Sequence, residues 1–562
     1  MTSAELKSFY ENASFRHQAV LLSVNKKIGI ISNARLFIAI AFIVTLYFAF
    51  SLHDLFYILP ILFVSFVLLV RHHSRLFDQK VHLENLVRVC RYELKGLEGD
   101  LSGFDPGTDF IDGHHAYSHD LDIFGAGSLF QYLNRCHTRG GRKLLASRLS
   151  SPLQTEDDIR QHQDAVRELS ECTPFRNEIQ ARGMEVEELS DDRQELKEWI
   201  SHPSFLYGKG FYPFVLLIFP ALTVLLLFLS FFVDGMSKFF WMAAGLQWIF
   251  LGFHLKRVNT FHQYIGRKKE MLVKYARVLK EIEFADFRSR LLQDLKLNAA
   301  NAHKEMNVLA SLVGAFDARM NSMTNLFVNS ILLYDLQCVY RLEGWKERNA
   351  SRLERWMDTV EENELLCSFG TFAFNNASFV FPTINTERRL RAGAVAHPLI
   401  DAGERVANNI NMDNNGSVII ITGANMAGKS TFLRTLGINV VLALNGAPVC
   451  ASNFECPIVG LRSGMRTADS LKEHQSYFYA ELNRLRSIID DLKSGRQLLI
   501  LLDEILKGTN STDKQAGSVA LVKQLKDYPA LVVIATHDLE LGKLQNEFPH
   551  QVRNFCFEPA IS

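Results

Sequence analysis

The stretch from Ile419 to Leu436 constrains the fold of this chain more than any other part of it. The apolar residues 418–421 predict a buried strand, and the residues from Thr431 onward predict a helix. Between them Gly423 and Gly428 have the spacing of a phosphate-binding loop, G-x-x-x-x-G-K-[ST]. These glycines allow a tight turn, so that successive backbone N–H groups face a polyphosphate at the helix N-terminus. The stretch therefore predicts a nucleotide site.

The two residues that close this loop have chemical roles of their own. The Lys429 ammonium can reach the β- and γ-phosphates of a nucleotide, and the Ser430 hydroxyl is placed to ligate Mg²⁺. We therefore expect ATP and Mg²⁺ as the cofactors.

Two further apolar runs end in polar residues that suit the same chemistry. Residues 498–502 precede Asp503 and Glu504, and residues 530–535 precede Thr536 and His537. We expect Asp503 to hold Mg²⁺, directly or through water, and Glu504 to polarise the attacking water. A histidine that follows a strand beside a phosphate site suits a sensor of the γ-phosphate. We assign that role to His537.

Length, charge and cysteine content narrow the class of protein. A chain of 562 residues is too long for one ordinary core, so several domains are expected. Lys+Arg and Asp+Glu both number 61, so the chain has no overall basic excess that would indicate nucleic-acid binding. A balanced total still allows a local basic patch. The eight cysteines form no C-x-x-C pair and indicate reduced cytosolic thiols. His114, His115 and His119 have no recognised metal-ligand spacing and predict a solvated loop.

Four apolar runs lie in two pairs, 36–52 with 55–70 and 211–233 with 239–255. Paired runs with short turns are typical of transmembrane hairpins, and we predict four membrane helices. Basic residues flank the outer ends of both pairs, which places both termini and the middle segment in the cytoplasm. Buried core helices are the alternative interpretation of these runs. Residues 369–382 are rich in Phe, Val and Asn and predict the strand-rich start of the last domain.

The chain resembles the MutS family of ABC-type ATPases. The resemblance rests on T-G-A-N-M-A-G-K-S-T (Thr422–Thr431), L-L-D-E-I-L-K-G-T (Leu501–Thr509), A-T-H-D-L-E-L (Ala535–Leu541) and Ala396-His397-Pro398-Leu399. Asn425 and Met426 are characteristic, since most phosphate loops have other residues there. Arg466 to Glu481 is similar to the signature segment of the family.

The resemblance implies roles for particular residues. It implies that Ser476 reaches across a homodimer to the ATP of the partner, so that each ATP site is composite. It also implies that the whole loop binds ATP: Gly423, Ala424, Asn425, Met426, Ala427, Gly428, Lys429, Ser430 and Thr431. The chain departs from the family in several respects, and two of them bear on function. It has no room for a mismatch-recognition domain, and Leu506 stands where the family usually has Gly.

The sequence thus predicts an α/β P-loop (ABC-type) ATPase domain preceded by a mostly α-helical core with four transmembrane helices. The segments are a cytoplasmic N-terminal segment (1–35), the first hairpin (36–70), the first part of the core (76–205), the second hairpin (211–255), a helical lever arm (257–365) and the ATPase domain (369–562).

The expected function is that of a membrane-anchored ATPase whose hydrolysis switches a dimer. The expected location is the cytoplasmic membrane, crossed several times, with the ATPase domain in the cytoplasm. Mismatch recognition is doubtful without its domain. One alternative is a DNA-binding repair or recombination protein tethered to the membrane, with basic clusters such as 139–143 and 388–391 on phosphates, although the net charge does not support DNA binding. A second alternative is an ATP-driven transporter. The predicted spans argue against it, because they lack the charged residues that mark a substrate path.

Overall fold

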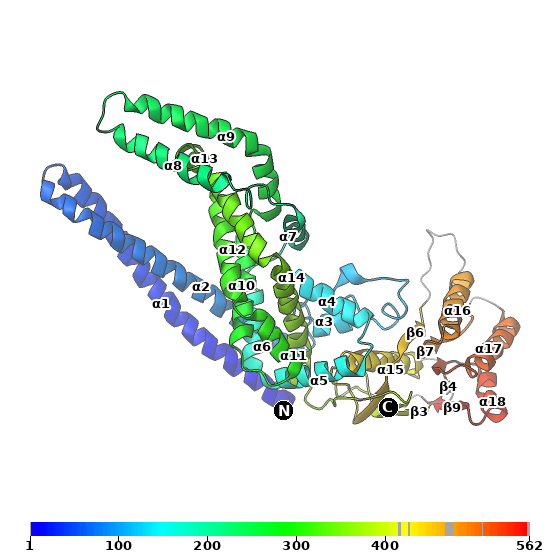
Figure 1. The fold of residues 1–562 in the computed structure, drawn as a ribbon. Coiled ribbons are helices and arrows are strands. Elements are labelled where there is room, and N and C mark those ends of the chain that lie inside the picture. The colour runs from blue at the N-terminus through cyan, green and yellow to red at the C-terminus, as the bar shows by residue number, and fades with distance from the viewer. Residues whose placement is uncertain are drawn as a thin grey trace.

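The structure is a computed structural model that describes residues 2–189, 192–413, 418–424, 427–466, 477–507 and 510–558. As far as residue 375 the regular elements of the described chain are helices. Two sheets with their own helices follow (Figure 1). This order confirms the predicted helical core followed by an α/β domain. The helices of the first part are α1 (Ser3–Ala49), η1 (His53–Tyr57), α2 (Leu59–Leu97), η2 (Thr108–Phe110), α3 (Leu129–Leu133), α4 (Arg139–Ser150), α5 (Glu156–Glu171), α6 (Thr173–Gly183), α7 (Asp192–Ser201), α8 (Tyr212–Leu229), α9 (Met236–Ile265), α10 (Lys269–Phe284), α11 (Arg290–Ala299), α12 (Ala302–Asp317), η3 (Ala318–Met320), α13 (Ser322–Leu332) and α14 (Tyr334–Asn375).

The first hairpin consists of α1 and α2, which pack against each other and turn at residues 50–58. α1 begins with a capping box in which the Glu5 carboxylate accepts a hydrogen bond from the Thr2 N–H at 2.7 Å. The helix continues through residue 35, so the predicted N-terminal segment and the first apolar run share one helix. Pro60 lies in the first turn of α2, where its missing N–H leaves no hydrogen bond unmade.

The base of this hairpin is fixed to the end of α14. Tyr10 is buried and its hydroxyl donates a hydrogen bond to Asn375 Oδ1 at 2.9 Å. The Phe9 ring meets the Phe374 ring edge-on, with 5.3 Å between the centroids. The N-terminal half of α1 is therefore part of the helical core, and the apolar half extends beyond it (Figure 1).

The second hairpin consists of α8 and α9, and the short helix α13 packs against both. Gln247 on α9 is buried and donates to Thr223 Oγ1 at 2.6 Å and to the Phe219 carbonyl at 3.2 Å, both on α8. Trp248 Nε1 donates to Ser330 Oγ of α13 at 2.8 Å. The sequence did not distinguish α13 from the lever arm around it. With α13 packed on α8 and α9, the second hairpin is a three-helix unit.

Three helical segments of the described chain are long and apolar enough to cross a membrane: Ser3–Ala49, Asp54–Leu97 and Tyr212–Leu229. Within the described part of the chain, no residue in the most apolar stretch of either of the first two is buried. α9, which holds the predicted fourth span, is not among the three, because polar residues such as Gln247 and His254 interrupt its apolar run. Both hairpins extend from the core in a similar direction, away from the sheets (Figure 1).

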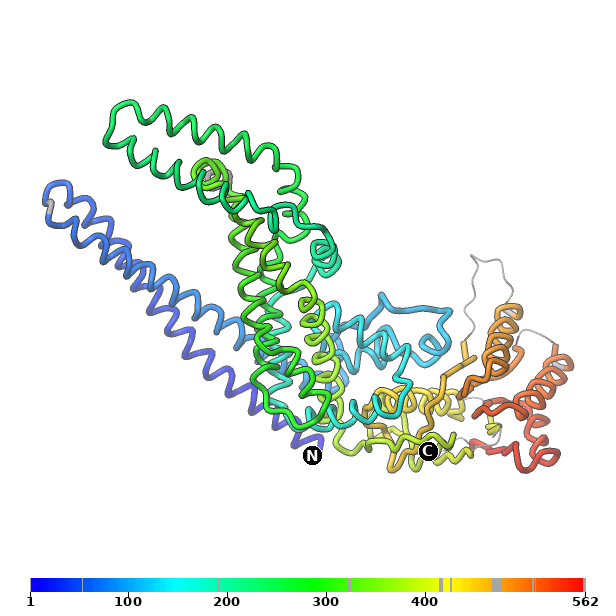
Figure 2. The backbone as a smooth tube through the Cα atoms, viewed as in Figure 1, coloured from blue at the N-terminus to red at the C-terminus, as the bar shows by residue number. Residues whose placement is uncertain are grey.

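The lever arm predicted over 257–365 is divided among the end of α9, the helices α10 to α14 and the short helix η3. α12 leads up to α13, and α14 returns toward the sheets (Figure 2). With 42 residues at 1.5 Å each, α14 is about 63 Å long. Its start is fixed by a buried ion pair, in which Arg319 Nε lies 2.9 Å from Asp335 Oδ2. α14 thus joins the second hairpin to the α/β domain directly.

The strand-rich start predicted over 369–382 was wrong. α14 continues to Asn375, and the first strand begins only at Thr383. Phe369 and Phe372 are buried one helical turn apart, so tertiary packing selects the helix in a segment whose aromatic content also suits a strand.

The α/β domain contains two sheets. The smaller has the strand order β1-β5-β2-β3, and the larger is wholly parallel with the order β6-β7-β8-β4-β9. The central strands β4, β7 and β8 are buried along almost their whole length, as expected for a parallel sheet covered on both faces. The elements are β1 (Thr383–Asn385), β2 (Leu390–Val395), β3 (Asn408–Met412), β4 (Val418–Gly423), α15 (Lys429–Leu444), β5 (Asn453–Pro457), β6 (Gly460–Gly464), α16 (Tyr477–Lys493), β7 (Leu498–Asp503), α17 (Ser511–Leu525), β8 (Leu531–Ala535), α18 (Leu539–Glu547) and β9 (Val552–Phe557).

α15 is the helix that joins the two parts of the protein. At Gly437 an added Cβ would touch Leu121 of the helical core on one side and Leu501 of β7 on the other. The helix is therefore packed between the large sheet and the loop before α3, close enough to require a glycine.

Two adjacent glycines at the start of α4 allow it to approach α14. Glu364 of α14 accepts hydrogen bonds from the His137 and Thr138 N–H groups at 3.1 Å, which places a carboxylate at the N-terminus of α4. A Cβ at Gly140 would overlap the Glu361 carboxylate, and one at Gly141 would overlap that of Glu364.

We expect Gly141→Ala to lower the free energy of unfolding by about 1–3 kcal/mol, because the added methyl group must displace a buried carboxylate. Denaturant or thermal unfolding of the detergent-held protein measures this effect. Gly210→Ala is the control, since no atom lies within 4 Å of a Cβ built there. Equal stability of the two variants would show that α4 and α14 can separate to admit the methyl group at no cost in the free energy of unfolding.

Candidate active site

The predicted site residues gather at the carboxyl ends of β4, β7 and β8, which are neighbours in the large sheet. Asp503 is paired with Ala535 in the register of β7 and β8, and Ile421 is paired with the same Ala535 in that of β4 and β8. The three strands therefore end at one level. In parallel α/β sheets this edge is where ligands bind.

The loop after β4 has the backbone that a close approach to a ligand requires. Gly423 and Gly428 have φ of +151° and +85°, and a Cβ at Gly423 would overlap the Phe557 carbonyl of β9. Lys429 is buried, and its Nζ donates to the carbonyl oxygens of Gly423 at 2.7 Å and Ala424 at 2.8 Å. The ammonium group is thus held over the loop by the loop itself.

The next residue, Ser430, connects the loop to β7, which is separated from β4 by β8. Ser430 Oγ donates to Asp503 Oδ2 at 2.5 Å, and both side chains are half-buried. A hydroxyl and a carboxylate in contact are the hard oxygen ligands that Mg²⁺ takes. The chemistry of the pair fits a site for a magnesium ion.

Glu504 and His537 form a second pair beside the first. His537 Nδ1 lies 3.0 Å from Glu504 Oε1, and the Glu504 N–H donates to the Ala535 carbonyl at 2.8 Å. Burial tends to raise the pKa of Glu504, but the hydrogen bond from His537 and the charges of that histidine, Lys507 and Lys514 together hold the pKa below its ordinary value. Glu504 is therefore a carboxylate at neutral pH, able to accept a proton.

Comparison with known proteins shows that the segments around this site are similar to domains of one protein family. A family model described as MutS domain V matches residues 419–559, and one described as MutS domain III matches residues 117–199. Both matches support membership of the MutS family. The domain V match contains the loop and both pairs described above, and the domain III match contains the core loop that packs on α15.

Three curated relatives, each named DNA mismatch repair protein MutS, illustrate the extent of the similarity. Those of Thermotoga petrophila and Thermotoga maritima are 36% identical over 176 and 204 residues, which are 30% and 35% of this chain and 22% and 25% of the relatives. That of Streptococcus thermophilus is 30% identical over 230 residues, 40% of this chain and 26% of the relative. The chain thus matches about a quarter of the length of these MutS proteins.

The structure places most of the predicted site residues together. The contacts above involve Gly423, Ala424, Lys429, Ser430, Asp503, Glu504 and His537. Ala427 and Gly428 complete the loop, and Thr431 is exposed on the first turn of α15. Asn425, Met426 and Ser476 lie outside the described residues.

Glu481 and the histidine loop before α3 were not assigned a functional role from the sequence. Glu481, at the end of the signature segment, contacts the turn after Glu504, and its place in that segment was the only signal for it. The loop of His114, His115 and His119 contains no metal cluster among the residues that the structure describes. Instead, His115 Nδ1 accepts hydrogen bonds from the Tyr117 and Ser118 N–H groups at 3.3 and 3.0 Å.

Proposed function

We propose that this MutS-family protein binds and hydrolyses ATP with Mg²⁺. The observation that carries the proposal is the pairing at the strand ends, where Ser430 meets Asp503 at 2.5 Å and Glu504 meets His537 at 3.0 Å. A loop that approaches a ligand through its backbone, a cation-ligand pair and an ionised carboxylate are the groups that phosphoryl transfer to water requires.

Each residue has a distinct task in this proposal. The backbone of residues 423–428 and the Lys429 ammonium bind the phosphates, and Ser430 and Asp503 hold the ion. Bound Mg²⁺ supplies neutralisation of the charge that develops on the phosphate oxygens. Glu504 orients a water molecule and takes its proton, and His537 fixes the carboxylate of Glu504 and senses the γ-phosphate.

A pH profile tests the role of His537 separately from its effect on rate. Removing its hydrogen bond in His537→Ala should raise the pKa of Glu504, so Glu504 becomes protonated, and activity is lost, at a higher pH than in the wild type. The acid limb of the kcat profile should move upward. An acid limb that stays in place would remove the link between the two residues.

We propose further that the protein works as a homodimer with composite ATP sites, each completed by Ser476 of the other protomer. The proposal rests on the similarity of the segment 466–481 to the MutS signature. Hydrolysis would switch the dimer between two arrangements. α14 runs from the α/β domain to the second hairpin and would transmit that change.

The two hairpins support a proposed location in the cytoplasmic membrane, with the ATPase domain in the cytoplasm. The most apolar stretches of α1 and α2 contain no buried residue in the described part of the chain, and large exposed apolar patches mark a membrane or a partner. Their basic outer flanks favour a cytoplasmic side for the core. We place the chain in a membrane-bound branch of the family.

DNA binding is the second candidate function. It is favoured by the curated relatives, whose name assigns them to DNA mismatch repair. The balanced charge of 61 basic and 61 acidic residues gives it no support.

One assay separates the candidates: ATP hydrolysis by the nanodisc-held protein, alone and with homoduplex, mismatched and branched DNA at two salt concentrations. Turnover that ignores every DNA would support a membrane ATPase switch. Turnover that changes with DNA in a salt-sensitive way would support a DNA function, because phosphate contacts weaken with salt. Failure to hydrolyse ATP under any condition would overturn the proposed enzyme.

A further inference from the structure

The turn that follows Glu504 has a strained backbone. Glu504 and Leu506 have φ of +55° and +58°, in the left-handed region that disfavours residues with a side chain. Two amides of this turn bond to one carboxylate on α16. The Leu506 N–H donates to Glu481 Oε1 at 2.6 Å, and the Lys507 N–H donates to Glu481 Oε2 at 3.1 Å. Glu481 thus holds the conformation that carries Glu504.

Little water can replace Glu481 at this position. The crevice between α16 and the turn is lined by Glu481, Arg484, Glu504 and Lys507 among others, and it holds about 20 Å³, room for about one water molecule. The loss of the carboxylate would therefore leave the amide of the buried Leu506 without an adequate partner, and the strained turn would relax.

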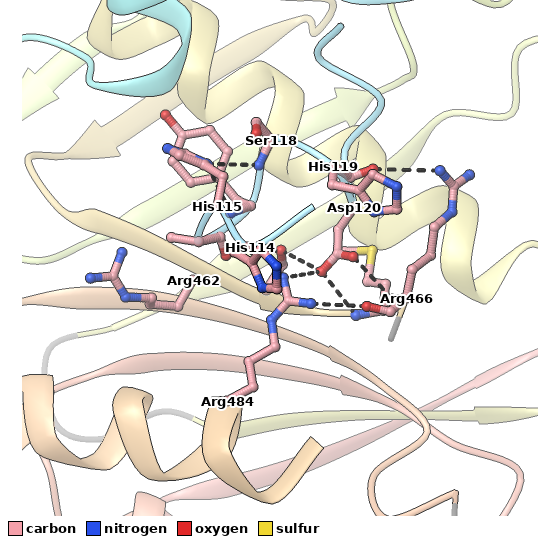
Figure 3. Close-up of polar contacts among 12 residues, drawn as sticks. His114, His115, Ser118, His119, Asp120, Arg462, Arg466 and Arg484 are labelled. Atoms are coloured by element: carbon pink, nitrogen blue, oxygen red, sulfur yellow. Dashed lines mark hydrogen bonds and ion pairs between the residues drawn. The ribbon is translucent and has the colours of Figure 1, made fainter. Parts of the chain in front are cut away.

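One helical turn further along α16, Arg484 contacts the helical core. Its Nη2 donates to Asp120 Oδ2 at 2.8 Å, and its Nη1 donates to the Arg466 carbonyl at 2.9 Å (Figure 3). Residues three apart on a helix lie on neighbouring parts of its surface, so Glu481 and Arg484 move together. The same rigid helix therefore contacts the turn of Glu504 and the core.

Asp120 is fully buried and is the point where the core holds the α/β domain. Besides Arg484 it accepts hydrogen bonds from Ser463 Oγ at 2.8 Å, from the Met465 N–H at 3.1 Å and from the Arg466 N–H at 3.0 Å. Figure 3 shows Arg484, from α16, and Arg466, from the segment after β6, close to Asp120. All of the donors belong to the domain V match and Asp120 belongs to the domain III match.

The loop of Asp120 is itself firmly held and also reaches α15. The Tyr117 hydroxyl donates to the Leu149 carbonyl of α4 at 2.8 Å, and Arg434 Nε of α15 donates to the Asp120 carbonyl at 3.1 Å. The loop thus contacts both α15, which begins with Lys429, and α16, which holds the turn of Glu504.

We propose that Asp120 and Glu481 are positioning residues for Glu504. Asp120 fixes α16 through Arg484, and Glu481 on that helix fixes the Leu506 turn, so the geometry of Glu504 depends on where the helical core sits. The inference rests on the proposed role of Glu504 in ATP hydrolysis. It deepens that role by giving the core a direct route to the carboxylate.

The test compares Glu481→Gln and Asp120→Asn with the wild type, all as full chains in nanodiscs. Each variant should lower kcat for ATP by roughly tenfold or more, the effect of one lost charged hydrogen bond, while KM for ATP stays the same. Amide hydrogen exchange in a peptide covering residues 503–507 should accelerate in both. Arg486→Gln is the matched control, because Arg486 lies on the same helix and its side chain is 81% exposed.

A rescue variant distinguishes positioning from a general loss of structure. Glycine adopts positive φ without strain, so Leu506→Gly should restore part of the kcat lost in Glu481→Gln. The effects of Asp120→Asn and Glu481→Gln should also be less than additive when combined, since they act through one helix. Should Asp120→Asn fold poorly, Arg484→Gln breaks the same contact from the other side.

The outcomes separate this inference from the proposed function. Wild-type turnover together with unchanged kcat and exchange in Asp120→Asn and Arg484→Gln would overturn the inference and leave the ATPase intact. Absent wild-type turnover would overturn the ATPase, and the exchange of residues 503–507 would still decide whether Asp120 and Glu481 hold the turn.

Discussion

Glu504→Gln is expected to lower kcat for ATP hydrolysis by about 100-fold or more, the usual contribution of a general base. Glutamine keeps the size of the side chain and can still bond to His537, but it cannot take a proton from water. ATP affinity should change little, because Lys429 bonds to the loop and Ser430 bonds to Asp503, and neither contact involves the Glu504 side chain. The variant would therefore hold ATP without turning it over.

Steady-state kinetics and an equilibrium ATP-binding measurement check both halves of this expectation. Glu547→Gln is the control, since Glu547 is an exposed residue of α18 whose partner is Lys523. A Glu504→Gln protein that retains more than about a tenth of wild-type kcat would show that another group accepts the proton. One that loses ATP binding would show that Glu504 shapes the pocket and is not confined to the chemical step.

The core of the site was predictable because its parts are local in the sequence. A strand, a glycine turn and a helix start fit within eighteen residues, and the turn requires Gly423 for a reason that the structure shows directly, the Phe557 carbonyl. The strand order was not predictable in the same way. That β8 lies between β7 and β4, and so brings His537 to Glu504, depends on pairings between distant segments.

The remaining differences have the same physical origin. Residues 369–375 form a helix because α14 buries Phe369 and Phe372 against the core, a choice that local composition does not determine. α13 was missed because its apolar face is recognised only when α8 and α9 are beside it. Asp120 was missed because four of its partners are more than 340 residues away, and a lone aspartate in a loop has no pattern. Contacts between parts decide each case.

The membrane role that we propose for the first hairpin leads to the second prediction with a large expected effect. Ile43 on α1 and Ile61 on α2 each have 65% of their surface exposed, within apolar stretches that the protein leaves uncovered. An arginine in the middle of a membrane helix costs about 2.5–3.5 kcal/mol of insertion free energy, so Ile43→Arg with Ile61→Arg should disfavour insertion by about 5–7 kcal/mol. Gln18→Arg is the control, because it adds the same charge to the exposed surface of α1 outside the apolar run.

The position of the hairpin tip reports the result even if the second hairpin keeps the protein on the membrane. A cysteine placed by Asp54→Cys should react with an impermeant thiol reagent added to cells whose cytoplasmic membrane faces the medium. The exposed Cys556 of β9 should react only after the membrane is opened. The double arginine variant should lose the labelling at residue 54, and the Gln18→Arg variant should keep it. Labelling of both cysteines only after opening, in the protein with native apolar runs, would mean that the hairpin lies on one side of the membrane. Its apolar surface would then bind a protein partner, because a surface of that size does not remain in water.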